Sequence, residues 1–337
     1  MVKSANMSPP TITIGILAYP GCLPSSAVIP LDVLRIANTI AALRPSSLRV
    51  HFEGLLVSAR GAKAIAAGGL TLRPAALAVD GLDALIVPGI EHRTAGDVTA
   101  VLDTLDKERE ALSAFAQTGR PLASTCSGTC LVASAGLLDG RRCTASWWLA
   151  AYFARTFPDV EIDAGEMLVQ DGSLLSSGGV TSSLDLALWL VGHFGGDELR
   201  QLTAKVLVTD ASRVSQAPYV ASALVQGDGN AIVERARRWL NQRLDKVWTM
   251  AELARHCHSS ERTVLRRFQD ALGVTPVQHA QQLRVERAKA LLESTALPME
   301  EITSRCGYED VSTFSKIFKR WTAATPREYR QRFGLRR

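Results

Sequence analysis

The chain has 337 residues, of which 47% are hydrophobic and 21% charged, and its formal net charge is +5 at pH 7. This length exceeds what one compact core usually serves and favours two or three domains of an ordinary globular protein. No window of about eighteen residues is uninterruptedly apolar, and the N-terminal segment lacks the apolar core of a signal peptide. We therefore expect a cytoplasmic protein with no membrane partner.

The net charge is unevenly divided along the chain. Residues 1–200 carry 15 Lys and Arg against 19 Asp and Glu, a net charge of −4, whereas residues 201–337 carry 23 against 14, a net charge of +9. An acidic front part and a basic rear part are typical of a protein in which one domain faces nucleic acid and the other faces away. A basic half alone is weak evidence, because basic surfaces also bind acidic membranes and partners.

Six cysteines lie scattered along the chain, at positions 22, 126, 130, 143, 257 and 306. None forms a C-x-x-C pair, and no histidine spacing indicates a zinc site. We therefore predict free thiols in a reducing cytosol, no metal site and no cofactor.

Strand and helix patterns alternate through the front part. Buried strands are predicted over 11–19, 48–59, 83–89 and 121–125, and helices over 28–43, 98–117 and 181–194. Alternation of this kind predicts a mostly parallel sheet covered by helices on both faces. The predicted fold class is α/β, with a doubly wound, flavodoxin-like N-terminal domain over residues 1–196.

The segment ASTCSGTCLVASAGLL contains a cysteine at a sharp strand-to-helix turn. A buried strand ends at Thr125, Cys126 follows, and Gly128 opens a helix. This nucleophile-elbow arrangement places the cysteine above the carboxyl end of the sheet, where open α/β sheets bind ligands. The nearby helix N-terminus favours a thiolate.

The longer segment STCSGTCLVASAGLLDGRRCTASWW resembles the ThiJ/PfpI group, which has a class I glutamine-amidotransferase-like fold. It is most similar to the sensor domain of GlxA-like regulators, and the resemblance runs from about residue 11 to 194. Members that are enzymes need a base or an acid near the cysteine. The matching positions here hold hydroxyls, at Ser127, Ser26 and Ser146, so the resemblance implies a pocket for binding rather than catalysis.

We predict that this pocket takes a small-molecule effector, with the candidate ligand residues Cys126, Ser127, Ser26, Glu91 and Trp147. Glu91 follows the predicted strand over 83–89 and is a plausible pocket acid. Trp147 and Trp148 begin a predicted helix near the pocket mouth, where a paired aromatic is also explained by packing alone. His92 fits an ordinary surface histidine.

Residues 197–245 are predicted to link the two parts. Residues 230–244 are predicted to form a basic amphipathic helix. The pattern fits an element of dimerisation or domain contact, and it fits a packed connecting helix equally well.

The remaining residues, 246–337, read as two helix-turn-helix units in an all-α domain. In the first, Ser260 is the predicted cap of the second helix, and Val264 and Phe268 line its inner face. In the second, Gly307 suits a left-handed helix end and Asp310 is the predicted cap. A long helix over 275–294 joins the units.

RTVLRRFQDALGVTPVQHAQQLRVERAKALLE and EITSRCGYEDVSTFSKIFKRWTAATPREYR together resemble the DNA-binding domain of AraC/XylS regulators over roughly ninety residues. A recognition helix offers its N-terminal half to base edges in the major groove. By motif position, the resemblance assigns base-facing roles to two sets of residues: Arg262, Leu265 and Arg266 in the first unit, and Ser312, Thr313 and Lys316 in the second.

The order of the two domains implies a GlxA-like regulator of the AraC/XylS family. The resemblance further implies double-stranded promoter DNA and RNA polymerase as partners, an activating role, a homodimer, and an effector that contains nitrogen, such as an amino acid or a quaternary amine. Two alternatives remain open. One is a cysteine-dependent hydrolase or amidotransferase fused to a DNA-binding module, and the other is a regulator that senses oxidation of Cys126.

Overall fold

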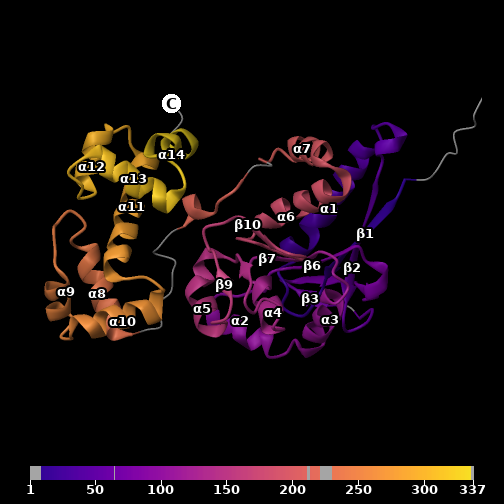
Figure 1. Cartoon of the computed structure of the whole chain (residues 1–337), viewed down its shortest axis with the longest axis horizontal. Coiled ribbons are helices and arrows are strands. Elements are labelled where there is room, and N and C mark those ends of the chain that lie inside the picture. The colour runs from indigo at the N-terminus through magenta and orange to yellow at the C-terminus, as the bar shows by residue number, and fades with distance from the viewer. Residues whose placement is uncertain (1–8, 64, 211–212, 221–229, 335–337) are drawn as a thin grey trace, which may run out of the picture. The chain divides into compact units, whose positions relative to one another are not determined.

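A computed structural model describes residues 9–63, 65–210, 213–220 and 230–334. The predictions for the extreme N-terminus and for part of the linker (211–212 and 221–229) lie outside the described residues. The chain forms two compact units, one made of residues 1–149 and 156–214 and the other of residues 150–155 and 215–337. Figure 1 shows the elements of each unit.

The first unit is built on a seven-stranded sheet with the order β10-β11-β7-β6-β1-β2-β5. The strands are β1 (Thr11–Leu17), β2 (His51–Ser58), β5 (Ala75–Ala76), β6 (Ala84–Val87), β7 (Leu122–Thr125), β10 (Leu168–Asp171) and β11 (Leu174–Ser177). All neighbours pair in parallel except β10, which is antiparallel to β11. The run β2-β1-β6-β7-β11 is the flavodoxin order, which confirms the predicted doubly wound fold.

Helices cover both faces of this sheet (Figure 1). One face carries α1 (Pro24–Ala41), α6 (Ser182–Gly195) and α7 (Asp197–Val206), and the other carries α2 (Ala95–Leu102), α3 (Asp106–Ala116) and α4 (Gly128–Ser134). Every residue of β6 and β7 is buried, as expected for strands covered on both sides. Smaller elements complete this unit: β3 (Ile65–Ala67), β4 (Leu70–Leu72), β8 (Arg142–Cys143) and β9 (Glu161–Ile162). The short helix α5 (Ala150–Thr156) belongs to the second unit except for its last residue.

The single helix predicted over 98–117 is wrong, because the structure has two helices there, α2 and α3. The hydroxyl of Thr104 donates to the carbonyl of Val101 at 2.8 Å. Leu105 follows with a non-helical φ of −107° and is fully buried. A side-chain bond to a helix carbonyl competes with the next helical turn, so the chain bends and inserts Leu105 into the core.

The second unit contains α8 (Ala231–Asn241), α9 (Met250–His256), α10 (Glu261–Leu272), α11 (Pro276–Ser294), α12 (Met299–Arg305), α13 (Val311–Thr322) and α14 (Pro326–Phe333). Two separate apolar cores hold them together. Val264 and Phe268 are fully buried in the first core, and Phe314 and Phe318 in the second, which confirms the predicted inner faces. In the described residues of both units, no helix is long and apolar enough to cross a membrane.

The helix α11 belongs to both cores, since Ala280 is buried in the first and Ala288 in the second. The helix α8 lies in the first core, where Val233 and Trp239 are buried. Of the two interpretations that the sequence left for this helix, packing is therefore observed. The first helix-turn-helix core begins upstream of residue 246 as a result.

The helix-turn-helix units repeat one local plan. Ser260 accepts from the N–H of Thr263 at the start of α10, and Asp310 accepts from the N–H of Thr313 at the start of α13, which confirms both predicted caps. The hydrogen bond from the backbone N–H of Thr313 also lowers the pKa of the Asp310 carboxyl group. These caps fix the N-terminal turns of the two helices that the sequence predicts to meet DNA.

Gly307 closes the turn between α12 and α13, and its φ of +74° confirms the predicted left-handed conformation. A Cβ at this position would lie 2.3 Å from the carbonyl oxygen of Leu244. Gly273, at the end of α10, also has a positive φ of +67°, but nothing lies within 4 Å of a Cβ there. Alanine substitutions at these two glycines therefore separate the free-energy cost of the left-handed backbone from the cost of a steric clash.

We predict that Gly307→Ala lowers the free energy of unfolding more than Gly273→Ala does, as measured by urea denaturation of the full chain. The left-handed conformation costs an alanine roughly 1–2 kcal/mol at either site. At Gly307 the displaced backbone adds about 1–3 kcal/mol, the usual range for overpacking. Equal losses at the two sites would show that the approach to Leu244 places no constraint on the turn.

Candidate functional site

The predicted strand-to-helix turn is present at Cys126, between β7 and α4. Cys126 has a φ of +57°, an uncommon conformation for a residue with a side chain and one that is often found at functional sites. Its N–H donates to the carbonyl of Ser177 at 2.9 Å. A Cβ at Gly128 would lie 2.1 Å from the carbonyl oxygen of Pro88, so glycine is required for α4 to start this close to the end of β6.

This turn lies at the carboxyl end of β7, next to β6. The strand order reverses between β1 and β6, since the chain runs from β1 outward to β2 and then returns to the other side of β1. Open α/β sheets bind ligands outside the carboxyl ends of their strands at such a switch point. The topology therefore places Cys126 beside the usual ligand position of this fold.

The sulfur of Cys126 is enclosed, with 1% of the residue exposed. Sγ lies 2.9 Å from Oγ of Ser146 and 3.8 Å from Oγ of Ser127. Burial raises the pKa of the Cys126 thiol, and the hydrogen bonds from Ser146 and Ser127 offset only part of this effect. The direction of this shift is opposite to the expected thiolate, because removal of the sulfur from water outweighs the hydrogen bonds that it receives.

Ser127 and Ser26 brace the loop that follows β6. The hydroxyl of Ser127 accepts from the N–H of Ile90 and donates to its carbonyl, both at 2.9 Å. The hydroxyl of Ser26 accepts from the N–H of Gly89 at 3.0 Å and donates to the carbonyl of Leu23 at 2.9 Å. Both hydroxyls are buried and bonded within the protein, so they hold the loop after β6 in place beside Cys126.

Ser26 and Cys126 meet at Gly89. A Cβ on Gly89 would lie 3.2 Å from Cβ of Cys126. Glu91 continues the same loop, where its N–H donates to the carbonyl of Gly21 at 2.8 Å and its side chain is exposed. Four of the predicted ligand residues, Ser26, Glu91, Cys126 and Ser127, are therefore gathered around the end of β6.

Trp147 directly follows Ser146 and is half-buried. It meets Trp148 edge to face, with ring centroids 5.3 Å apart. The indole N–H of Trp148 donates to Nε2 of His92 at 3.2 Å, and Nδ1 of His92 bonds the carbonyl of Ile90 at 2.8 Å. His92 thus joins two loops, a role that the sequence did not reveal because 56 positions separate it from Trp148.

A surface cleft of about 520 Å³ lies elsewhere on the sheet unit, at the carboxyl end of β2 and beside α3. Ser58, Leu77, Lys107 and Glu110 are among the residues that line it. None of the five predicted ligand residues does so. Its volume is in the range of small-molecule sites, which makes it a second place to test for an effector.

All six cysteines are unpaired and buried. In the part of the chain that the structure describes, no group of three or more His, Cys, Asp and Glu side chains is arranged to hold a metal ion.

The helix α10 presents Arg262, Leu265 and Arg266 outward, with Leu265 39% exposed. Val264 and Phe268, on the opposite side, are fully buried. The three outward residues occupy the N-terminal half of the helix, where a recognition helix contacts base edges. The structure therefore brings the first predicted set onto one exposed surface.

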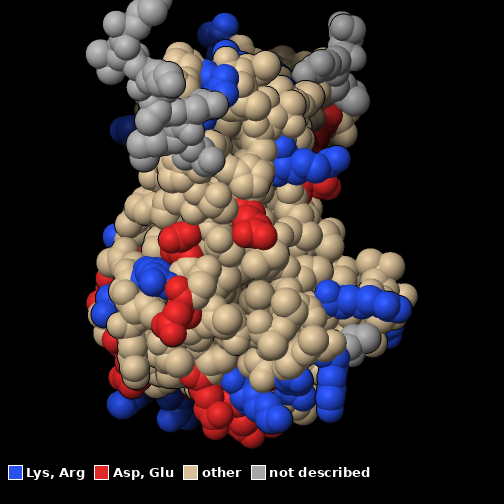
Figure 2. Space-filling view, turned by 90° about the vertical axis from the view of Figure 1, so that its right-hand side faces the viewer, with Lys and Arg blue, Asp and Glu red and all other residues tan. Residues whose placement is uncertain are grey.

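The helix α13 presents Ser312, Thr313 and Lys316 in the same way, and all three are exposed. Lys316 is the sixth residue of α13, just as Arg266 is the sixth residue of α10. Each recognition-helix candidate thus carries a cation at an equivalent position. By contrast, the face of the molecule in Figure 2 mixes acidic and basic side chains, with wide areas that carry neither.

Comparison with known proteins assigns both domains. Residues 26–193 match the DJ-1/PfpI family, and residues 253–332 match a helix-turn-helix domain family. The HTH-type transcriptional regulator GbdR of Pseudomonas aeruginosa (strain UCBPP-PA14) is 29% identical over 262 residues, which cover 75% of this chain and 71% of GbdR. CdhR of Pseudomonas aeruginosa, also an HTH-type transcriptional regulator, is 27% identical over 322 residues, or 93% of this chain and 90% of CdhR.

A third HTH-type transcriptional regulator, GlxA of Rhizobium meliloti, is 27% identical over 244 residues, which cover 71% of this chain and 74% of GlxA. These relatives span both domains in the order found here. The chain therefore belongs to the AraC-type, DNA-binding transcriptional regulators that carry a DJ-1/PfpI domain in front of the helix-turn-helix domain.

Proposed function

We propose that this regulator is an activator controlled by a small metabolite that binds at the elbow of Cys126. The resemblance to GlxA-like regulators favours a nitrogen-containing effector, and it favours a homodimer that works with RNA polymerase. Coupling of this kind requires that the effector bind one state of the protein more tightly than another.

The environment of the sulfur carries this proposal. In the described chain, the side chains that hydrogen-bond to Sγ of Cys126 are those of Ser146 and Ser127. Neither hydroxyl acts as a base near neutral pH, and burial raises the pKa of the thiol itself. A nucleophilic cysteine needs a base within reach and a lowered pKa, which are the opposite conditions. This supports our proposal of a pocket that binds its ligand without turning it over.

The exposed sets on α10 and α13 support sequence-specific contact with two half-sites. An arginine such as Arg266 can bond a guanine edge in two places, and Leu265 can meet a thymine methyl group. Ser312 and Thr313 can bond either base edges or phosphates. We propose that these residues read bases while neighbouring cations hold the backbone.

The first prediction of this proposal concerns the effector. In a thermal-shift screen against amino acids and quaternary amines, we expect one compound to stabilise both the wild type and Cys126→Ala. At about one hundred times its dissociation constant, a ligand stabilises by roughly 2.7 kcal/mol. Glu91→Gln or Trp147→Ala should weaken this shift, whereas Lys107→Ala, in the separate cleft, should not.

A shift lost only in Lys107→Ala would move the effector site to the cleft beside α3. A compound that the wild type consumes and Cys126→Ala does not would instead identify the front domain as an enzyme.

A second prediction concerns the reactivity of Cys126. At pH 8 we expect iodoacetamide to alkylate Cys126 in the folded protein at least about tenfold more slowly than in the urea-unfolded protein, as followed by mass spectrometry. The thiolate is the reactive form, and a raised pKa shifts its appearance to higher pH. The rate should therefore still be rising with pH above 9. Fast alkylation at pH 7 would contradict the proposal and favour a catalytic or redox-sensing thiol.

A third prediction concerns DNA. On a duplex obtained by in vitro selection, Arg266→Ala should weaken binding by about 1–3 kcal/mol and relax the base preference at one position. The exposed neighbour Arg267 provides a matched control, because Arg267→Ala removes the same charge from a different side of α10. Equal losses of binding free energy on every duplex would show that Arg266 contacts phosphate and not a base edge.

A further inference from the structure

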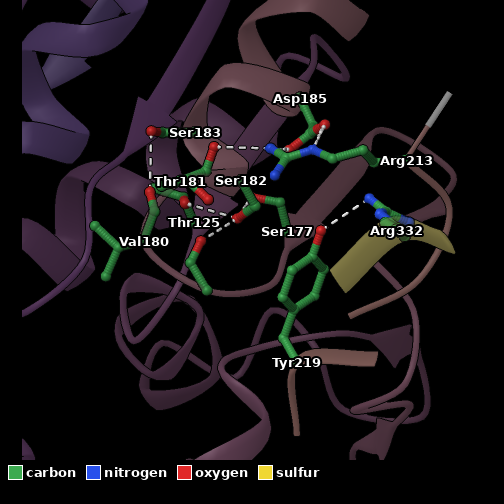
Figure 3. Close-up of polar contacts among 11 residues, drawn as sticks. Thr125, Ser177, Val180, Thr181, Ser182, Ser183, Asp185, Arg213, Tyr219 and Arg332 are labelled. Carbon is green, nitrogen blue, oxygen red and sulfur yellow. Dashed lines mark hydrogen bonds and ion pairs between the residues drawn. The ribbon is translucent and has the colours of Figure 1, made fainter. Parts of the chain in front are cut away.

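A chain of polar contacts leads from the elbow to the helix α6, and Figure 3 shows its part from Thr125 and Ser177 to Ser182. The N–H of Cys126 bonds the carbonyl of Ser177, and Oγ of Ser177 lies 3.1 Å from Oγ of Ser182. Thr125, which directly precedes Cys126, has its Oγ1 3.5 Å from the same Ser182 oxygen. All four residues are buried, so a shift of the backbone at Cys126 reaches Ser182 without passing through solvent.

Ser182 opens α6, and Asp185 lies in the same first turn. The carboxylate of Asp185 binds the Arg213 guanidinium with both oxygens: Nε lies 3.1 Å from Oδ1, and Nη2 bonds Oδ2. Nη2 also donates to the carbonyl of Thr181 at 3.3 Å. The next residue, Val214, accepts from the N–H of Met167 at 3.0 Å. Residues 213–214 are therefore fastened to the end of α6 and to the adjoining part of the sheet unit.

This ion pair differs from the surface pairs of the same unit. The side chains of Arg213 and Asp185 are 15% and 9% exposed, whereas Asp197, which pairs with Arg200 on α7, is 73% exposed. Exposed pairs contribute little, but removal of one partner of a buried pair leaves an uncompensated charge. Loss of either partner of this buried pair therefore costs more than loss of a partner of the exposed pair.

The chain continues into residues that are bound to the helix-turn-helix unit. The hydroxyl of Tyr219 accepts from Nη2 of Arg332 at 2.9 Å, and the Tyr219 ring meets Phe333 edge to face at 5.7 Å. The carbonyl of Val220 accepts from Nζ of Lys289, a lysine that is 6% exposed. Residues 219–220 are thus held by α11 and α14, around the second core.

We propose that residues 213–220 form a strap that carries the state of the elbow to the DNA-binding unit. The latch of the strap is the Asp185–Arg213 pair, and its clasp is the set of contacts made by Tyr219 and Val220. This inference rests on the proposed function of the elbow as the effector site. An effector that moves the backbone at Cys126 displaces Ser177 and Ser182, turns the start of α6 and so shifts the latch equilibrium.

Trypsin reports the latch without any effector, because it must take the Arg213 side chain into its own pocket before it cuts the following bond. In the native full-length protein, we expect Asp185→Asn to accelerate cleavage after Arg213 at least about tenfold. Ser182→Ala, which breaks the path on the elbow side, should accelerate it several-fold. Asp197→Asn removes the exposed pair and should have no effect.

Cleavage after Arg60 provides the internal control. Arg60 binds the buried carboxylate of Glu108, an ion pair of the same unit that lies outside the path from the elbow to Arg213. The proposal fails if Ser182→Ala leaves the cleavage rate after Arg213 unchanged. It also fails if the same variant accelerates cleavage after Arg60 to an equal extent.

DNA affinity tests the other end of the strap. On the selected duplex, we expect Asp185→Asn and Tyr219→Ala each to change the dissociation constant at least about threefold, and Asp197→Asn to leave it unaltered. Because the latch acts through the clasp, the double variant should match Tyr219→Ala alone. If the changes in dissociation constant caused by the two single variants multiply in the double variant, the latch does not act through the clasp and the proposal is wrong. A wild-type chain that selects no duplex would defeat the proposed function, while the trypsin rates would still decide whether the elbow controls the latch.

Discussion

The close approach between the end of β6 and the start of α4 is the contact on which the arrangement of the loops after β6 and β7 depends. Gly128 permits it, because any Cβ there would collide with the carbonyl oxygen of Pro88. The approach allows Ser127 to bond both backbone groups of Ile90 and brings Cys126 against Gly89. Cys126 must then adopt a left-handed backbone, which its bond to Ser177 holds in place. Loops that are distant in sequence therefore meet in a single defined arrangement.

The same arrangement is consistent with our proposal that the elbow binds a ligand without reacting with it. A reactive thiol requires a partner that stabilises its anion, and the hydroxyls of Ser146 and Ser127 do so less than burial opposes it. A binding pocket has a different requirement, namely a rigid concave wall with a few polar groups at fixed positions. The braces made by Ser26 and Ser127 supply that rigidity. Under our proposal, hydroxyls at Ser146 and Ser127 therefore leave the shape of the elbow intact without making its thiol reactive.

The sequence predicted what depends on local pattern and missed what depends on meetings between loops. Alternating strands and helices gave the flavodoxin-like sheet, and spaced apolar residues such as Phe268 and Phe318 gave the two helical cores. Ser260 and Asp310 were predictable as caps, since a cap acts within three residues. The bond between Trp148 and His92 joins residues 56 positions apart, and no period encodes it. The thiolate expectation failed for a related reason, because a helix start is visible in sequence and the burial of Cys126 is not.

The two cores of the helical unit determine which helices the proposed strap acts on. The first core is closed by α8, while the contacts of Tyr219 and Val220 are made with α11 and α14 around the second core. A strap that pulls on this second core acts on α13 more directly than on α10. Because α11 contributes to both cores, a displacement of the second core reaches α10 only through α11. Under the proposed coupling, the effector therefore acts first on the DNA contacts of α13, and on those of α10 only as far as α11 transmits the displacement.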